Sequence, residues 1–498
     1  MSIHYDVCVI GGGPSGYAAA MRGIDFGLRV LLIEKDKIGG AGLYNGALSS
    51  KTLWEISKDV DHAVKRTNKY STNSKFELNF DEVRKELGQA VFERKTQLET
   101  HLYMLQSEGY KEQFFLKYGN AKFLTNTQIE ITASDGSVEI IEAAHSIIAT
   151  GSSPRKLSNI AIDEKIIVTS DGIHHWEELP KSMVVLGAGV IGCEYATIYS
   201  NFGKTKVFVI DKADHILPFE DLDIVQKVEQ SLMENGVVIH RNSTLVRMDK
   251  VNGMVEYELL YKDGTSDVFQ VEKALVAVGR VPNTTGLGLE DIGVKLNNRG
   301  AIIDEDTQTT VPNIYAVGDV TADIALVNVG ELEGRHAIKR IVDKVKYPLS
   351  YDNISSIMFL KPIVASVGMN EKQARAKGIS YQVVTIDYSC IPRAIAMRNP
   401  KGFFKILVTN DRDMKVLGMR AMGPHASSAI QAVALLISAD LGIEELAEMI
   451  YPHPSLIEGI QEAARVLLGK PIFKPHIFKH GIKYKGYMDG DFSPLLGK

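Results

Sequence analysis

The sequence predicts an α/β protein in which one strand–turn–helix–strand unit occurs twice and an α+β region follows. The first unit, over residues 5–34, reads YDVCVI, GGGPSG, an alanine-rich helix and RVLLIE. The second, over residues 182–211, reads SMVVLGAGVIGCEYATIYSNFGKTKVFVID. From about residue 350 the pattern changes to GFFKILV, KVLGMRAMG and a long apolar helix, AIQAVALLISADLG. Two α/β units and a different third region are therefore expected.

Between the two units, the apolar residues of the 80–108 stretch fall on one face of a predicted helix. They are Val83, Leu87, Val91, Leu98, Leu102 and Leu105. Hairpin-like strands are expected to follow around ASDG and to lead to SIIATGSSP.

The first glycine-rich turn has the form expected of a nucleotide-binding loop. Gly11, Gly13 and Gly16 lie between a strand and a helix, and Glu34 ends the next strand. The first glycine permits a tight turn, the second lets the backbone approach a pyrophosphate, and the third lets helix and strand pack closely. The helix N-terminus attracts the negative charge, and Glu34 would accept hydrogen bonds from a ribose. We expect a Rossmann-like dinucleotide-binding domain.

The second turn repeats this pattern with Gly187, Gly189 and Gly192, and Asp211 ends the following strand. Glycine turns without a ligand remain the alternative, but strand, glycines, helix and acid all occur twice in the right order. A carboxylate about 4 Å from a 2′-phosphate costs on the order of 4 kcal/mol at an effective dielectric near 20. Lys212 would offset part of this, but no arginine cluster is present after it. The pattern therefore favours NADH over NADPH.

Composition excludes several other classes of protein. The chain has 498 residues and a net charge of -5, which argues for several domains and against a nucleic-acid partner. Cys8, Cys193 and Cys390 are too far apart for a disulfide framework or a zinc knuckle, so we expect no metal site. The first strand begins at Tyr5, and no uncharged apolar run is long enough for a membrane span. We expect a cytoplasmic protein.

Taken together, the motifs of residues 5–469 resemble those of the class I pyridine nucleotide–disulfide oxidoreductases, and are closest to the dihydrolipoamide dehydrogenase type. They are GGGPSG with Glu34, GGxxLxxGxxxSK, ATGSSP, GAGVIGCE, VGRVPNT, YAVGDV and HPSLIEGIQEA. The resemblance implies a homodimer of chains that each have two Rossmann-like domains, for FAD and NAD, and a C-terminal α+β dimerisation domain. The implied boundaries are 1–155 and 285–350 for FAD, 156–284 for NAD, 351–469 for dimerisation and 470–498 for a tail.

The resemblance also implies roles for individual residues. Ala121 would contact the adenine through its backbone, Asp319 would bind the ribityl chain, and Lys51, paired with Glu194, would lie near flavin N5. The implied FAD-binding set is Gly11, Gly13, Gly16, Glu34, Gly40, Lys51, Ala121, Thr150, Gly151 and Asp319. The implied NAD-binding set is Gly187, Gly189, Gly192, Asp211 and Gly279.

The chain departs from the family at the redox centre. Family members with a redox disulfide read approximately GGTCLNVGCIPSK, whereas residues 39–51 here read GGAGLYNGALSSK. The glycines predict a loop here, which leads into a helical pattern that begins TLWEIS. Gly42 and Ala47 therefore replace the two cysteines, and Ser49 replaces a proline. Thiol–disulfide exchange needs a thiolate, so we expect disulfide reductase activity to be absent. Tyr44, which the usual motif lacks, would either cap the vacated space or simply pack there.

His453 and Glu458 keep the family's spacing of a histidine and the glutamate that orients it. An oriented imidazole suits proton transfer near neutral pH. Two interpretations stay open at this stage: proton donation to an acceptor reduced at the flavin, or a retained interface hydrogen bond without a catalytic role.

These observations predict an FAD-dependent NADH oxidoreductase that passes hydride to a small-molecule acceptor without a disulfide, either quinone-like or a second nicotinamide nucleotide. The alternatives are a flavin-binding pseudoenzyme or regulatory subunit, and a protein that carries the label dihydrolipoyl dehydrogenase by homology alone.

The tail, with loosely alternating lysines and aromatics, suits a packed or mobile arm, or a surface for a partner or a membrane.

Overall fold

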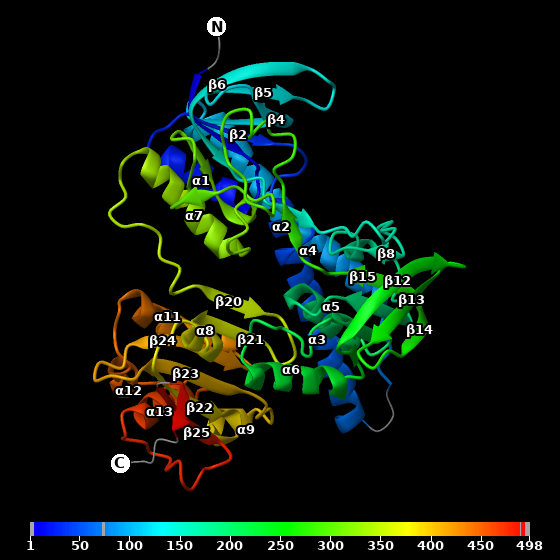
Figure 1. The fold of residues 1–498 in the computed structure, drawn as a ribbon, viewed down its shortest axis with the longest axis vertical. Coiled ribbons are helices and arrows are strands. Elements are labelled where there is room, and N and C mark those ends of the chain that lie inside the picture. Colours follow the sequence, from blue (N-terminus) through cyan, green and yellow to red (C-terminus); the bar gives the residue numbers. More distant parts are fainter. Residues whose placement is uncertain (1–3, 72–74, 489, 494–498) are drawn as a thin grey trace. The chain divides into compact units, whose positions relative to one another are not determined.

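A computed structural model describes residues 4–71, 75–488 and 490–493 of the chain (Figure 1). The predicted first domain begins, and the predicted tail ends, in residues outside this described part. The chain forms two compact units. The first unit is Met1–Gly187, Asn201–Ile210 and Ser243–Leu349, and the second is Ala188–Ser200, Asp211–Asn242 and Ser350–Lys498.

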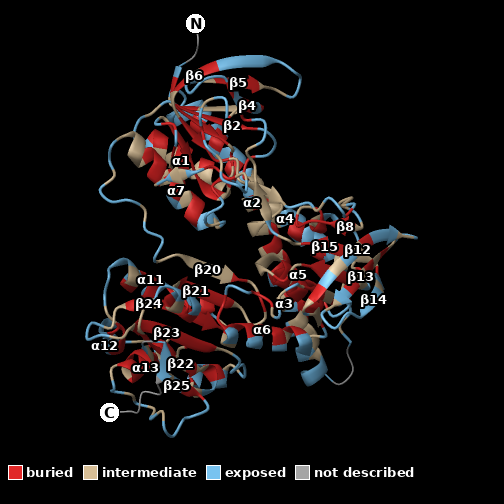
Figure 2. Ribbon diagram, viewed as in Figure 1, coloured by how far each residue is buried: buried red, intermediate tan, exposed pale blue. Residues whose placement is uncertain are grey.

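The first unit contains a mostly parallel sheet in the order β17-β18-β19-β6-β1-β2-β3. Strands β19, β6, β1, β2 and β3 are parallel, and their buried apolar residues form the core of this unit (Figure 2). The strands are β1 (His4–Ile10), β2 (Val30–Glu34), β3 (Phe114–Tyr118), β6 (Val138–Ile148), β17 (Asp304–Glu305), β18 (Gln308–Thr309) and β19 (Ile314–Ala316). Strands β4 (Asn120–Phe123) and β5 (Gln128–Thr132) join β6 in the predicted hairpins.

A second parallel sheet in this unit has the run β10-β9-β15-β8. Its strands are β8 (Ile167–Val168), β9 (Ser182–Leu186), β10 (Lys206–Ile210) and β15 (Lys273–Val276). An antiparallel sheet, β12 (Ser243–Val251), β13 (Met254–Tyr261) and β14 (Ser266–Val271), accompanies it, and β7 (Ser152–Pro154) pairs with β16 (Arg280–Pro282). Both predicted α/β units therefore begin with buried parallel strands.

Helices α1 (Pro14–Asp25) and α7 (Val327–Ile341) pack closely together in the first unit. A Cβ on Gly334 would lie 2.3 Å from the Ser15 carbonyl oxygen, so glycine is needed for this approach. The unit's other helices are α2 (Gly40–Leu43), α3 (Ala47–Tyr70), α4 (Phe80–Met104), the π-helix η1 (Leu105–Gly109) and the 3₁₀ turns η2 (Ile173–His175) and η3 (Gly318–Val320).

The amphipathic helix predicted within residues 80–108 is confirmed as α4 and η1. Asn79 caps it, because its Oδ1 accepts hydrogen bonds from the backbone amides of Asp81 and Glu82. The predicted apolar face is buried or half-buried, with Val83, Leu87, Val91, Leu98, Leu102 and Leu105. The pattern thus identified both the helix and the face that packs.

The second unit contains α5 (Val190–Asn201), except its last residue, α6 (Leu222–Glu234), β11 (Val238–His240) and an antiparallel sheet. The sheet order is β20-β21-β24-β23-β22-β25-β26. Its strands are β20 (Ser355–Met358), β21 (Val364–Gly368), β22 (Tyr381–Asp387), β23 (Phe403–Thr409), β24 (Val416–Met422), β25 (Ile482–Met488) and β26 (Asp491–Ser493). The shorter helices are α8 (Glu371–Ala376), η4 (Tyr388–Cys390), α9 (Pro392–Ala396), α10 (Ala426–Ala429), α11 (Gln431–Ser438), α12 (Glu444–Glu448) and α13 (Glu458–Leu467).

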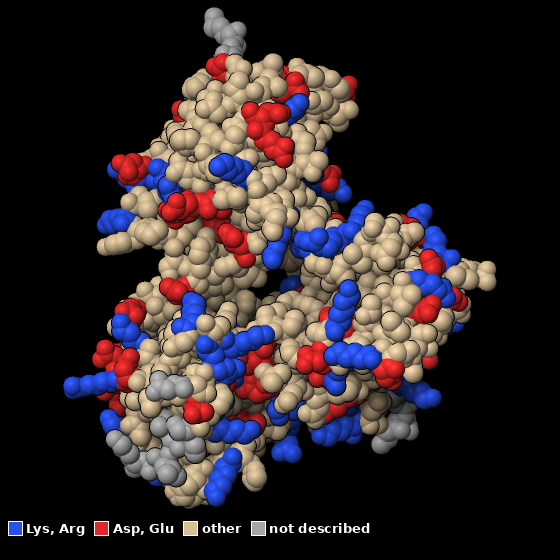
Figure 3. Space-filling model, viewed as in Figure 1, with Lys and Arg blue, Asp and Glu red and all other residues tan. Residues whose placement is uncertain are grey.

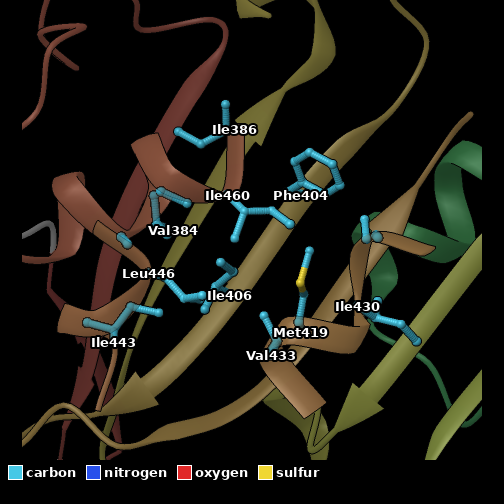
Figure 4. Packing of buried hydrophobic residues seen from close by; sticks show 14 of the residues in the cluster. Val384, Ile386, Phe404, Ile406, Met419, Ile430, Val433, Ile443, Leu446 and Ile460 are labelled. Atoms are coloured by element: carbon cyan, nitrogen blue, oxygen red, sulfur yellow. The ribbon is translucent and has the colours of Figure 1, made fainter. Parts of the chain in front are cut away.

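One apolar cluster fills the space between this sheet and its helices (Figure 4). Phe404 and Ile406 from β23 and Met419 from β24 meet Val433 from α11 and Ile460 from α13. All five are buried, at 2 % exposure or less. The predicted α+β region therefore has its own hydrophobic core between its sheet and its helices.

The apolar helix predicted at residues 429–442 is confirmed as α11, but it is shorter than predicted, because it begins at Gln431 and ends at Ser438. Asp440 takes a left-handed conformation with φ 54°, and Gly442 forms a β-bridge with Lys415. The end of the apolar run therefore returns to the sheet instead of continuing as helix.

The described strands of the tail, β25 and β26, pack as part of the antiparallel sheet. Strand β25 pairs with β22, and β26 pairs with β25, so the tail extends the sheet and covers the β22 edge. Covering an edge removes a site for unwanted strand pairing. Charges of both signs are interspersed over the face drawn in Figure 3. Within the described residues, no helix is long and apolar enough to cross a membrane.

Candidate functional site

The first glycine-rich turn is built for close backbone approach. Gly11 has φ 108°, and a Cβ there would lie 2.4 Å from the Ala149 carbonyl oxygen. A Cβ on Gly16 would lie 1.9 Å from the Gly11 oxygen, whereas a Cβ on Gly13 would meet nothing within 4 Å. Two of the three glycines are therefore required by the fold, and Gly13 faces open space, as the predicted pyrophosphate site requires.

Glu34 is held as a hydrogen-bond acceptor at the end of β2. Its Oε2 accepts a hydrogen bond from the Gly12 amide at 2.7 Å, and its Oε1 accepts one from the Asp36 amide at 2.8 Å. The side chain is buried, with 8 % exposure. Each oxygen has a remaining lone pair, so the carboxylate also suits a ribose hydroxyl.

Asp319 belongs to a polar cluster around β7 and β16, and the Gly151 carbonyl oxygen accepts a hydrogen bond from the Asn283 amide at 2.9 Å. The Ser152 hydroxyl donates to Asp319 Oδ2 at 2.6 Å, and Arg280 Nε donates to the Ser152 oxygen at 2.7 Å. Arg280 Nε lies 3.9 Å from Asp319 Oδ2. Sequence reasoning missed Ser152 and Arg280, although both occur in the motifs ATGSSP and VGRVPNT.

Thr150 lies beside this cluster, and its hydroxyl donates to the Asn283 carbonyl oxygen at 2.7 Å. The Asn283 amide group donates in turn to the Thr150 carbonyl oxygen at 2.9 Å. Ala121 is buried in β4, opposite Ile131 of β5. These contacts hold the backbone of two predicted FAD-binding residues.

The stretch from Gly39 to Lys51 is mostly helical, not the loop expected from its glycines. Helix α2 covers Gly40–Leu43, and α3 begins at Ala47, so Lys51 lies in the second turn of α3. Gly40 approaches the first turn, because a Cβ on it would lie 3.4 Å from Gly13 Cα. The chain at Gly40 therefore reaches the open space beside Gly13.

Residues 42 and 47, the positions at which the resemblance places the family's cysteines, are glycine and alanine. An added side chain would be obstructed at position 42 and at Gly46, which precedes Ala47. A Cβ on Gly42 would lie 2.5 Å from Pro14 Cγ, and a Cβ on Gly46 would lie 2.3 Å from the Ala41 carbonyl oxygen. A side chain at position 42 therefore requires the proline ring to move. Tyr44 packs partly buried, with Lys37 Nζ 5.4 Å from its ring centre.

The chain's three cysteines are free and poorly suited to redox exchange. Burial raises the pKa of the Cys8 and Cys193 thiols far above the usual range. Burial also raises the pKa of Cys390, with the Asp387 carboxylate adding to the shift. None of the three thiols forms a thiolate readily near neutral pH.

The second glycine-rich turn uses the same local geometry as the first. In the first unit, Gly187 has φ 105°, and its Cβ would lie 2.5 Å from the Ala277 carbonyl oxygen. In the second unit, Asp211 accepts hydrogen bonds from the amides of Ala188 at 2.7 Å and Ala213 at 2.9 Å. A Cβ on Gly189 would meet nothing within 4 Å.

The remaining predicted residues are distributed over both units. Gly192 lies in the first turn of α5, and Gly279 has φ 100° just before β16. In the second unit, Glu194 Oε1 accepts a hydrogen bond from the Phe359 amide at 2.9 Å. The Lys51–Glu194 pair stays a prediction, because the two residues belong to different units.

His453 and Glu458 form the predicted pair within the second unit. His453 Nδ1 lies 2.8 Å from Glu458 Oε1, and Glu458 Oε2 accepts a hydrogen bond from the Ser455 backbone amide at 2.7 Å. Burial raises the pKa of Glu458, but the hydrogen bonds from Ser455 and His453 outweigh it and hold that pKa below its usual range. The imidazole is 70 % exposed, so it is oriented yet accessible.

Buried ion pairs, which sequence reasoning missed, connect α6 to the antiparallel sheet. Lys405 Nζ lies 2.9 Å from Asp221 Oδ2, 2.8 Å from Asp223 Oδ2 and 2.7 Å from Glu371 Oε1. Lys485 of the tail also contacts Glu371, at 2.9 Å. The isolated lysine in GFFKILV could have suggested a buried ion pair, since it interrupts an apolar strand.

Comparison with known proteins identifies the family. Residues 5–334 match the family described as pyridine nucleotide-disulphide oxidoreductase, and residues 354–464 match that family's dimerisation domain. The chain belongs to this family. The predicted fold class is therefore confirmed, and the dimerisation domain supports a homodimer.

Similar proteins span nearly the whole chain. Dihydrolipoyl dehydrogenase of Bacillus subtilis (strain 168) is 33% identical over 95% of this chain and 100% of its own length. Leghemoglobin reductase of Vigna unguiculata is 32% identical over 94% of this chain and 88% of its own.

Two solved structures are also similar to this chain. LpdA from Mycobacterium tuberculosis has a TM-score of 0.83 at 27% identity, covering 93% of this chain and 99% of its own. The HOCl-induced flavoprotein disulfide reductase RclA from Escherichia coli has a TM-score of 0.81 at 26% identity, covering 93% of this chain and 100% of its own.

The protein is thus a flavin-dependent pyridine nucleotide oxidoreductase of the dihydrolipoyl dehydrogenase type, and its family binds FAD and NAD(H). The residues present fit both groups. Each glycine-rich turn has one glycine, Gly13 or Gly189, that leaves open space where a phosphate fits, and a fixed acid, Glu34 or Asp211, that suits a ribose.

Proposed function

We propose that this protein transfers a hydride from NADH, through bound FAD, to a small acceptor that contains no disulfide. The acceptor is a quinone-like molecule or a second nicotinamide nucleotide. In the quinone case NADH loses two electrons and a proton as hydride, and the quinone gains two electrons and two protons. The second proton comes from solvent or from His453.

The replacement of both family cysteines carries this proposal. Gly42 and Ala47 have no sulfur, and the position of a Cβ on Gly42 lies 2.5 Å from Pro14 Cγ. The three cysteines that the chain does have are held as thiols by burial. A disulfide substrate needs a thiolate partner in exchange, so we expect disulfide reductase activity to be absent.

The flavin supplies the redox chemistry when bound, and the chain supplies binding, orientation and charge. Gly11, Gly13, Gly16 and Gly40 would hold the pyrophosphate, with Glu34 on the ribose. Ala121, Thr150, Gly151 and Asp319 would contact the rest of the cofactor, and Lys51, with Glu194, would place a positive charge near flavin N5.

The second turn would hold NADH. Gly187, Gly189, Gly192 and Gly279 would approach the dinucleotide. Asp211, fixed by two backbone amides, would accept a hydrogen bond from the ribose and repel the 2′-phosphate of NADPH.

His453 would donate a proton to the acceptor. Its Nδ1 is bound by Glu458, which leaves Nε2 to act, and 70 % of the side chain is exposed. In this proposal Glu458 is the positioning residue. We place the protein in the cytoplasm, since none of its three cysteines is paired.

Anaerobic mixing of the purified holoprotein with NADH, followed by flavin absorbance, tests the proposal. We expect rapid bleaching, reoxidation by a quinone or by a second nicotinamide nucleotide, and no turnover of dihydrolipoamide. The matched comparison is the double variant Gly42→Cys with Ala47→Cys, which places cysteines at both positions. We expect this variant to turn over dihydrolipoamide poorly, because a side chain at position 42 collides with the Pro14 ring.

Two results would contradict the proposal in different ways. A flavin that neither NADH nor NADPH bleaches would favour the alternative of a flavin-binding pseudoenzyme or regulatory subunit. Turnover of dihydrolipoamide by the parent protein would show that the family label of dihydrolipoyl dehydrogenase describes its activity, and would disprove the non-disulfide acceptor.

A further inference from the structure

The chain has a strongly basic segment at and after the end of α13 that the proposed function does not use. Residues 463–488 contain no Asp or Glu, although the whole chain has a net charge of -5. The same stretch contains one arginine and five lysines. The match to the family's dimerisation domain ends at residue 464, so nearly all of this segment lies beyond the family's domains.

Four of these lysines carry exposed charges that no carboxylate neutralises locally. Arg465 pairs with Glu462, and Lys485 pairs with Glu371. The other lysines are exposed and form no ion pair with any residue that the structure describes, and they are Lys470, Lys474, Lys479 and Lys483. Such a run of one sign gives this part of the surface a positive potential that attracts anions.

Exposed apolar side chains lie among these lysines. Ile472 is 63 % exposed, Ile477 is 69 % exposed and Phe478 is 41 % exposed. Single exposed apolar residues are ordinary, whereas three within one short loop indicate a surface that contacts an apolar partner. The loop therefore combines positive charge with apolar side chains that nothing in the second unit buries.

The loop is held at both ends and turns between them. Phe473 packs against the core cluster of the second unit, and Ile482 is buried where β25 begins. Between these two residues, the Lys474 carbonyl oxygen accepts hydrogen bonds from the amides of Ile477 at 2.9 Å and Phe478 at 3.1 Å. The Phe478 ring packs edge-on against that of Phe473, with ring centres 5.2 Å apart. The exposed side chains are thus presented by a fixed turn of the folded unit.

We propose that this loop, residues 470–483, docks the protein on the surface of an anionic lipid bilayer. The lysines approach the negative headgroups, and the apolar side chains enter the boundary between headgroups and acyl chains. A nucleic acid would match the charges, but its phosphates have no use for exposed isoleucines. An anionic bilayer matches both, because it places negative charge directly above an apolar phase.

This inference goes beyond the proposed function and does not rest on it. It assigns a surface and a partner to a segment outside the nucleotide-binding turns. A bilayer is also where a lipid-soluble quinone dissolves, so docking would bring the protein to one of the two proposed classes of acceptor.

The test is co-sedimentation of the FAD-loaded protein with vesicles of phosphatidylcholine, alone or with about one third phosphatidylglycerol. We expect binding to the anionic vesicles only, and weaker binding at high salt. Replacing the four lysines by glutamine should weaken binding by more than about 100-fold, since each basic residue near such a surface contributes about fivefold. This variant combines Lys470→Gln, Lys474→Gln, Lys479→Gln and Lys483→Gln.

A charge-matched control removes four exposed lysines of the first unit, so that the net charge of the protein falls equally. It should bind the anionic vesicles like the parent protein. Each variant is compared at full FAD occupancy and with its thermal unfolding midpoint measured, so that loss of folding is recognised. The control combines Lys111→Gln, Lys165→Gln, Lys204→Gln and Lys262→Gln.

The apolar contribution is tested by the double variant Ile472→Ser with Ile477→Ser. We expect it to bind the anionic vesicles about tenfold or more weakly than the parent, because two aliphatic side chains no longer enter the bilayer. Val138→Ser with Val268→Ser changes two exposed apolar residues of the first unit and should leave binding unaltered.

Three results would overturn the inference. A parent protein that does not bind the anionic vesicles at low salt would refute docking outright. An equal loss of binding in the charge-matched control would assign binding to net charge and not to the loop. Unaltered binding in the isoleucine variant would indicate a purely electrostatic surface, as for an acidic protein or a nucleic acid. Because sedimentation needs neither NADH nor an acceptor, failure here is distinguishable from failure of the proposed function.

Discussion

The two glycine-rich turns have nearly the same backbone geometry although different residues surround them. Gly11 has φ 108° and Gly187 has φ 105°. In each case a Cβ would come within 2.5 Å of a backbone carbonyl oxygen, that of Ala149 or of Ala277. These carbonyl groups follow β6 and β15, the strands that pair with β1 and β9. Their close approach requires glycine at positions 11 and 187 independently of any bound nucleotide.

The two acids are also held alike. Glu34 accepts hydrogen bonds from the amides of Gly12 and Asp36, and Asp211 accepts them from Ala188 and Ala213. The turns differ in the course of the chain beyond the acid. After Glu34 the chain returns at Gly40 to the open space beside Gly13, whereas after Asp211 it continues to α6 and its buried ion pairs. The motif is local, and the segment after the acid distinguishes the two sites.

The largest effect should come from adding one methyl group to either turn. Gly11→Ala should abolish stable FAD binding, while Gly187→Ala should keep the flavin and weaken NADH binding by about 100-fold or more. Both changes place a side chain in a left-handed conformation against a carbonyl oxygen. Flavin absorbance per chain and NADH titration measure the two outcomes.

Gly264→Ala is the matched control for strain. Gly264 has φ 85°, but a Cβ on it would meet nothing within 4 Å. It should leave both ligands bound. Equal loss of FAD in Gly11→Ala and Gly187→Ala would show that the two turns are not independent sites.

The ion pairs after the second turn should give the next largest effect. Lys405→Met removes the cation that Asp221, Asp223 and Glu371 share, and leaves Asp221 and Glu371 buried, so we expect about 3–5 kcal/mol lower stability. Urea unfolding followed by circular dichroism measures this. Lys401→Met is the control, because Lys401 is exposed and its removal should cost under about 1 kcal/mol.

The same ion pairs predict loss of stability in acid. Burial raises the pKa of Glu371, but Lys405 and Lys485 outweigh it and lower that pKa to about 2, from 4.5. The carboxylate therefore stabilises the fold above about pH 4.5 and loses this contribution as the pH falls toward 2. The free energy of unfolding, measured between pH 2 and pH 7, should depend less on pH in Glu371→Gln than in the parent protein. An equal pH dependence in the two proteins would contradict the assignment of this effect to Glu371.

The smallest effect should be on cofactor choice at the second turn. Asp211→Asn removes the negative charge and should raise the preference for NADPH relative to NADH by about 10-fold to 100-fold, well within the Coulomb estimate of about 4 kcal/mol. The ratio of flavin reduction rates with the two nucleotides measures it. Asp214→Asn, a nearby exposed change, should leave the ratio unaltered; an unchanged ratio in Asp211→Asn would remove the charge argument for NADH.

The sequence by itself predicted the features that depend on local spacing. The glycine turns, the acids after them, the face of α4 and the His453–Glu458 pair all depend on residues close together in the chain. The presence of glycine and alanine at positions 42 and 47, where the resemblance places the family's cysteines, was likewise readable without coordinates. Such features are predictable because backbone strain and helical periodicity act over a few residues.

Tertiary structure alone decided the features that join distant segments. The close approach of residues 40–42 to Gly13 and Pro14, the Lys415–Gly442 bridge after α11 and the Lys405 ion pairs depend on partners elsewhere in the chain. No periodicity marks such partners, because burial and charge pairing depend on which surfaces meet after folding.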